Sequence, residues 1–290
     1  MSKTLLEVEV LTTMLKSEAP KFGSETASSL LGKSHTSSVY STLEKEVFPN
    51  FNCQDIVEIA GTAGCGKTEL LYHFICRCIL PPKWKRLNTG GLNCNVILVK
   101  TRGVFNVRRI AAILEKKIKK LIVASGSSIK KADILTFIEE KLKLVYVMTC
   151  FDSDAYFSAL CNLAFQIRMK KHNYIIMIDE IATFYLTDKM CASNQASFNH
   201  LNNKIVTYIK VISEKHKCPV IVTRRQIYTD EAADKKCLGA LWQNMVTCDI
   251  LLHLEKVTDS GTVISLANHK SGISRKFCIQ NDGLTFLINS

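Results

Sequence analysis

Residues 55–80 of the chain read DIVEIAGTAGCGKTELLYHFICRCIL and carry its clearest structural signal. The first part predicts a buried β-strand over Ile56–Ala60, and the last part predicts a helix that begins at Lys67 and ends before Pro81. Between them lies a loop that satisfies the pattern G-x-x-x-x-G-K-[ST], known as Walker A. The loop is Gly61-Thr62-Ala63-Gly64-Cys65-Gly66-Lys67-Thr68.

This loop predicts a site for the phosphates of a nucleotide. Glycines allow backbone N–H groups to close around phosphate oxygens, and the N-terminus of the following helix adds the positive end of its dipole. Lys67 is expected to reach the β- and γ-phosphates, and the Thr68 hydroxyl is expected to coordinate Mg²⁺. We therefore expect ATP and Mg²⁺ as cofactors, with Gly61–Thr68 as the main binding segment.

Short apolar runs of β-type alternate with helical patterns along the rest of the chain. The later runs are NVILVKT (95–101), LVYVMT (144–149), YIIMIDE (174–180) and PVIVT (219–223). This alternation favours βα units around a parallel sheet. After Trp242 the runs DILLHLEK, TVISLANHK and RKFCIQ follow one another directly. We therefore expect an α/β fold with a mostly parallel central sheet, flanking helices and antiparallel C-terminal strands.

Two further strand ends supply candidate residues for the nucleotide site. YIIMID ends in Asp179, a Walker B pattern whose carboxylate is expected to hold Mg²⁺. The adjacent Glu180 has two open interpretations, a carboxylate that polarises water or one that caps the following segment. PVIVT precedes Gln226, which could sense the γ-phosphate because ligands lie outside the carboxyl ends of such strands. An exposed polar loop start is the alternative interpretation of Gln226.

Composition excludes several classes of protein. The 290 residues are 47% hydrophobic and 22% charged, an ordinary globular composition. No apolar run approaches the roughly 18 residues that a membrane span requires. The 12 cysteines form no CxxC pair, so a reducing intracellular compartment is expected. The net charge of +12 keeps polyanions such as nucleic acid among the expected partners, and no membrane partner is expected.

Residues 1–50 differ from the rest of the chain. Gly23–Thr42 is rich in Ser and Thr and poor in bulky apolar residues, as in a linker. Before it, Leu5–Lys16 has a short helical pattern, for which a docking segment and a frayed terminus are equally open. We expect an N-terminal docking segment and linker over 1–50 and one core domain over 51–290.

Three stretches resemble RecA-like recombinases, and among them the recombinase paralogues. They are the P-loop segment through Pro81, IIMIDEIATFYLTDK (175–189) and KCLGALWQNMVTCDILLHLEK (236–256). The resemblance runs from about Ser41 to the C-terminus and implies a RecA-like P-loop NTPase core. It places the glutamine sensor on Gln226 and the two DNA-facing loops on about Thr183–Asn203 and Ile227–Gly239.

The resemblance implies a subunit of a heteromeric complex with other recombinase paralogues in the nucleus. Such a complex promotes homologous-recombination repair of DNA double-strand breaks and damaged forks, and it acts on single-stranded or branched DNA. The implied subunit binds ATP through the Walker A loop with weak or absent hydrolysis. A weak DNA-dependent ATPase activity stays open, and no catalytic residue is assigned.

The chain departs from active recombinases in three places. Those proteins carry a catalytic glutamate just after the second core strand, whereas NVILVKTRG places Arg102 at about that position. A guanidinium cannot act as the base that activates water. The second DNA loop, YTDEAADKKC (228–237), is short and mixes acidic with basic residues. The N-terminal segment is expected to be too short for the helical DNA-binding domain of recombinases.

Basic residues are the candidates for contacting DNA. Arg224 and Arg225 lie beside the proposed sensor, and Lys235 and Lys236 lie in the second loop. The lysines of EKKIKK (115–120) are instead expected to form a solvated helix face around Ile118.

Two other functions stay open at this point. One is a free-standing P-loop kinase of a small molecule, which would need an arginine-bearing lid. The other is a scaffold for partners and DNA in which the P-loop is vestigial.

Overall fold

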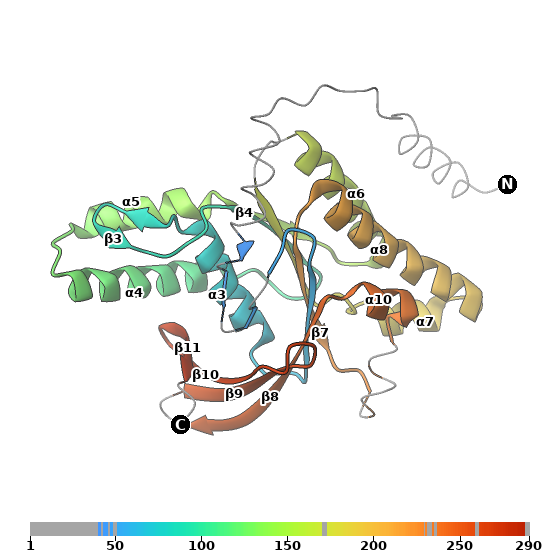
Figure 1. Ribbon diagram of the computed structural model, residues 1–290. Helices are drawn as coiled ribbons and strands as arrows, with labels where there is room; N and C mark the ends of the chain where they lie inside the picture. The colour runs from blue at the N-terminus through green and yellow to red at the C-terminus, as the bar shows by residue number, and fades with distance from the viewer. Residues whose placement is uncertain are drawn as a thin grey trace. The chain divides into compact units, whose positions relative to one another are not determined.

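The computed structural model describes residues 40, 41, 43–45, 47, 48, 51–169, 173–228, 230, 234, 237–258 and 261–287, with only the backbone at 168 and 169. Strands and helices alternate over most of this length, as in Figure 1. The strands are β1 (Ile56–Gly61), β2 (Lys83–Trp84), β3 (Leu87–Asn88), β4 (Asn95–Lys100), β5 (Val145–Thr149), β6 (Tyr174–Asp179), β7 (Val220–Arg225), β8 (Cys248–Thr258), β9 (Gly261–Asn268), β10 (Ser274–Gln280) and β11 (Gly283–Leu287). The helices are α3 (Lys67–Ile79), α4 (Val107–Ser125), α5 (Lys131–Leu142), α6 (Ser153–Met169), α7 (Tyr185–Cys191), α8 (Gln195–His216) and α10 (Gly239–Met245).

One nine-stranded sheet organises the fold, in the order β11-β10-β9-β8-β1-β7-β6-β4-β5. The strands from β8 to β5 in that order pair in parallel, and β8 to β11 pair as antiparallel neighbours. The P-loop strand β1 therefore lies inside the sheet, between β7 and β8. The α/β fold expected from the sequence, with antiparallel C-terminal strands, is confirmed.

Helices cover both faces of the parallel part of the sheet, as Figure 1 shows. In β6, Ile175 and Met177 pack with α3, α4 and α5, whereas Ile176 and Ile178 pack with α6, α8 and α10. Successive residues of a strand point to opposite faces, so a strand covered on both sides must be apolar throughout. This double burial explains the continuous apolar runs of the sequence.

The described residues before Phe51 pack against α3. Tyr40, Leu43 and Phe48 are buried in the same hydrophobic cluster as that helix. The Glu44 carboxylate lies 2.9 Å from the His73 ring. These residues contribute to the core, while Leu5–Lys16 and the chain up to residue 39 lie outside the described residues. The division at residue 50 stays a prediction.

A buried charge cluster links β1 to the segment after β7. Arg224 donates to Glu58 across 2.8 Å and to Asp234 across 2.5 Å. The Trp242 indole donates to the other oxygen of Glu58. Each charged side chain of the cluster is at most 7% exposed. Removing one partner would leave an uncompensated charge in the interior.

Arg224→Met should therefore lower the free energy of unfolding by about 3–5 kcal/mol, because two buried carboxylates lose their cation. Arg225→Met is the matched control, since it removes an exposed guanidinium from the next position, and it should change that free energy by less than about 0.5 kcal/mol. Urea denaturation measures both variants. Equal losses from the two would show that the cluster does not stabilise the fold.

Candidate nucleotide-binding site

The Walker A loop adopts a conformation that depends on its glycines. Gly64 has φ 79° and Gly66 has φ 80°, in the left-handed region that side chains disfavour, and α3 begins at the next residue, Lys67. A Cβ atom at Gly66 would lie 2.5 Å from Cδ1 of Ile264 and 2.6 Å from Cδ1 of Ile279. The antiparallel strands β9 and β10 therefore pack directly against the loop and hold it at the end of β1.

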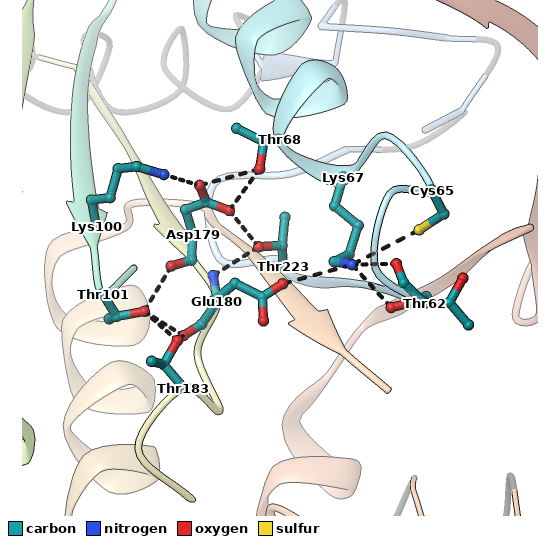
Figure 2. Close-up of polar contacts among 11 residues, drawn as sticks. Thr62, Cys65, Lys67, Thr68, Lys100, Thr101, Asp179, Glu180, Thr183 and Thr223 are labelled. Atoms are coloured by element: carbon teal, nitrogen blue, oxygen red, sulfur yellow. Dashed lines mark hydrogen bonds and ion pairs between the residues drawn. The ribbon is translucent and has the colours of Figure 1, made fainter. Parts of the chain in front are cut away.

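Lys67 folds back onto the loop. Its ammonium donates to the carbonyl oxygens of Gly61 at 3.0 Å and Thr62 at 2.8 Å. It also lies 3.7 Å from a carboxylate oxygen of Glu180, and the side chain is 7% exposed. Figure 2 shows these contacts at the start of α3. An incoming phosphate would replace the carbonyl acceptors, so the cation is already positioned for a nucleotide.

A cavity of about 550 Å³ opens beside the loop. Its lining joins the P-loop to the carboxyl ends of the neighbouring strands and to the C-terminal strands. The lining residues are Ala63, Gly64, Gly66, Lys67, Thr68, Glu69, Lys100, Arg102, Asp179, Glu180, Arg225, Thr262 and Ile279. The loop, the helix N-terminus and this cavity fit the triphosphate of a nucleotide.

The Asp179 carboxylate accepts hydrogen bonds from three other elements of the fold. Its carboxylate accepts from Lys100 at 2.5 Å, from Thr223 at 2.9 Å and from Thr68 at 3.3 Å. Lys100 and Asp179 are directly paired residues of β4 and β6, and Thr223 lies on the adjoining strand β7. The carboxyl ends of three parallel strands and the first turn of α3 thus meet at one carboxylate (Figure 2).

Glu180 is held in a strained backbone conformation, with φ 71°. Its N–H donates to Thr223 at 2.8 Å, and its carbonyl accepts from Thr101 at 2.6 Å and from Thr183 at 2.8 Å. Burial raises the pKa of the Glu180 carboxyl, and the neighbouring Lys67 opposes that shift. The carboxyl faces the cavity, and α7 begins without a side-chain hydrogen bond at its N-cap, so the capping interpretation is not supported.

The proposed sensor lies in a smaller cavity beside the first. That cavity, of about 240 Å³, shares Arg102, Glu180 and Arg225 with the larger one and is also lined by Gln226. The Gln226 N–H donates to the Gly61 carbonyl at 3.1 Å. Arg225 lines both cavities, so its side chain lies beside the P-loop cavity as well as beside Gln226. The sensor role of Gln226 stays a prediction.

The candidate residues for contacting DNA differ in their exposure and in whether the structure describes them. Arg224 is 2% exposed and fully engaged with Glu58 and Asp234, which argues against a DNA contact at this residue. Arg225 is exposed. Lys235 and Lys236 lie outside the described residues. The first DNA-facing loop, from Thr183, is described and contains α7 and the start of α8.

Sequence reasoning missed three polar residues of the site, Lys100, Thr101 and Thr223. The signal for them was present, because NVILVK and PVIVT each end a buried strand in a polar residue. Parallel strands end at the same edge of a sheet, but the Lys100 ammonium lies near Asp179 only because β4 and β6 are neighbours. The strand order, which the sequence did not supply, was the missing step.

The family model described as Rad51 matches residues 36–262. The chain belongs to the Rad51 family. Within that family it is a RecA-like recombinase paralogue, as the P-loop segment and the two later stretches predicted, and the resemblance is to the paralogue XRCC2.

Three curated relatives illustrate the distance within the family. The XRCC2 homologue of Arabidopsis thaliana is 26% identical over 208 residues, which cover 61% of this chain and 56% of that protein. Mouse DNA repair protein XRCC2 is 28% identical over 180 residues, which cover 57% of this chain and 55% of that protein. Human DNA repair protein RAD51 homolog 2 is 23% identical over 191 residues, which cover 65% of this chain and 46% of that protein. The chain therefore spans about half the length of these relatives.

Of the two expected cofactors, the site fits the nucleotide better than it fits Mg²⁺. Domains of this family typically bind a nucleotide together with Mg²⁺. The loop and Lys67 fit the phosphates, whereas the pair expected to hold Mg²⁺, Thr68 and Asp179, shares its carboxylate with the ammonium of Lys100. The described residues thus fit the nucleotide but not the metal.

The contact between the loop and the C-terminal strands can be tested with two glycines. Gly64→Ala should cost about 1–2 kcal/mol of unfolding free energy from the left-handed conformation alone, since no described atom lies within 4 Å of the new methyl group. Gly66→Ala has the same backbone penalty plus overpacking against Ile264 and Ile279, so it should cost about 1–3 kcal/mol more. Thermal and urea unfolding of the two variants measure the difference. An equal cost would mean that β9 and β10 do not support the loop.

Proposed function

We propose that the chain is a recombinase-paralogue subunit that promotes homologous-recombination repair of DNA double-strand breaks and damaged forks. The Rad51-family match supports this role, and the relatives described above are named DNA repair proteins. The proposal includes a heteromeric complex with other recombinase paralogues, single-stranded or branched DNA as the nucleic acid, and the nucleus as the compartment. None of the described helices is long and apolar enough to cross a bilayer.

Within that role, the chain binds ATP through the Walker A loop and hydrolyses it weakly or not at all. One observation carries this: the phosphate-binding loop is complete, while the end of the second core strand presents Lys100 and Arg102 to the cavity. Arg102 stands at about the position where active recombinases carry the glutamate that activates water. Two cations at this edge favour a polyphosphate and supply no base.

ATP binding is expected to depend on Lys67. Lys67→Ala should weaken ATP binding by at least about tenfold, because the cation positioned for the β- and γ-phosphates is lost. Isothermal calorimetry with the full chain measures the affinity, and Lys119→Met, which removes an exposed lysine of α4, is the matched control. Unchanged affinity in Lys67→Ala would favour the scaffold with a vestigial P-loop.

Hydrolysis is expected to stay near background with or without single-stranded DNA. A steady-state phosphate-release assay on the full chain and on its complex measures it. Turnover of about 1 s⁻¹ or more that disappears in Lys67→Ala would contradict weak hydrolysis. Phosphate transfer to a small acceptor by the isolated chain would instead support the kinase.

The partners can be identified by purification from cells of the source organism, followed by mass spectrometry and nucleotide extraction. Recombinase paralogues should co-purify with the full chain.

We assign docking to residues 1–50 and nucleotide binding to 51–290, so a chain lacking residues 1–36 should lose partners and keep ATP binding. Partner binding that survives this deletion would place the interface on the core domain.

A further inference from the structure

A lysine ammonium contacts the carboxylate that the Walker B pattern assigns to Mg²⁺. Lys100 Nζ lies 2.5 Å from Oδ2 of Asp179, and the two side chains are 6% and 4% exposed. The remaining lone pairs of the carboxylate face Thr223 at 2.9 Å and Thr68 at 3.3 Å. Every partner comes from a regular element, β4, β7 or α3, so the arrangement is built into the fold.

A divalent cation and this ammonium compete for the same carboxylate. Mg²⁺ requires nearly octahedral oxygen ligands at about 2.0–2.1 Å and retains several of its waters. An ammonium bound to Asp179 takes up that acceptor and repels a second cation. Moving Lys100 away would leave a buried lysine without its partner, which is strongly unfavourable.

The residues that line the cavity carry a net positive charge even without a metal ion. Its cations are Lys67, Lys100, Arg102 and Arg225, and its carboxylates are Glu69, Asp179 and Glu180, which gives a formal charge of +1 from four cations and three carboxylates. The Glu69 carboxylate is already engaged by Arg109, with contacts at 2.7 and 3.1 Å. Asp179 is engaged by Lys100 and Glu180 lies 3.7 Å from Lys67, whereas Arg102 and Arg225 are exposed, so the triphosphate would meet a lining with more cations than carboxylates.

We propose that this chain binds the triphosphate of a nucleotide without a divalent cation, and that Lys100 supplies the positive charge that Mg²⁺ supplies in other P-loop sites. The inference rests on the proposed nucleotide binding. It also gives a reason for weak hydrolysis, because the metal that neutralises charge during phosphoryl transfer is absent from the bound complex.

The test compares ATP affinity in EDTA with ATP affinity in excess Mg²⁺, by isothermal calorimetry on the full chain. The wild-type chain should bind ATP with affinities within about threefold of each other in the two buffers. Lys100→Met should bind at least about tenfold more weakly in EDTA than in Mg²⁺, because Asp179 becomes available to the metal and the fixed cation is gone. Lys119→Met on the exposed face of α4 should behave as the wild type.

The outcomes separate the inference from the proposed function. Wild-type binding that is strong in Mg²⁺ and at least about tenfold weaker in EDTA would overturn the inference and leave ATP binding intact. Absence of binding in both buffers would overturn the proposed nucleotide site and the inference with it. The wild-type comparison decides the question even where Lys100→Met fails to fold, and Lys100→Gln offers a second, polar replacement.

Discussion

The ion pair between Lys100 and Asp179 is the interaction around which the candidate site is arranged. It joins the carboxyl ends of β4 and β6, and the same carboxylate binds Thr223 of β7 and Thr68 of α3. A buried carboxylate must be compensated by cations and hydrogen-bond donors. The sheet order that brings these strands together is therefore the condition for both the stability of this edge and the shape of the cavity.

The P-loop half of the site and the strand-end half carry different chemistry. The loop keeps what phosphate binding requires, with Gly64 and Gly66 in the left-handed conformation and Lys67 at the start of α3. The strand ends place the cations Lys100, Arg102 and Arg225 beside the carboxylate of Asp179. Glu180, the remaining carboxyl beside the loop, lies 3.7 Å from Lys67 on a strained backbone that Thr101, Thr183 and Thr223 hold in place. This division supports the proposal of nucleotide binding with weak or absent hydrolysis.

Much of the architecture was predictable because local patterns determine it. The Walker A residues, the apolar strands and the change of rhythm after Trp242 predicted a RecA-like core with antiparallel closing strands, and the structure has both. The ion pairs were not predictable, since they depend on which strands are neighbours. Arg224 is the clearest case: the sequence made it a candidate for binding phosphate, whereas the fold buries it between Glu58 of β1 and Asp234. Lys100 is the converse, a strand residue without an assigned role that the register places against Asp179.

Crystals of the full chain grown with ATP and then soaked in Mn²⁺ would show directly which cation faces the phosphates. Anomalous scattering locates Mn²⁺, a close substitute for Mg²⁺ at oxygen ligands. The geometry described here predicts ATP in the cavity, Lys100 still within hydrogen-bond distance of Asp179, and no anomalous peak beside Thr68. A Mn²⁺ peak coordinated by Thr68 near Asp179, with the Lys100 side chain displaced, would contradict it.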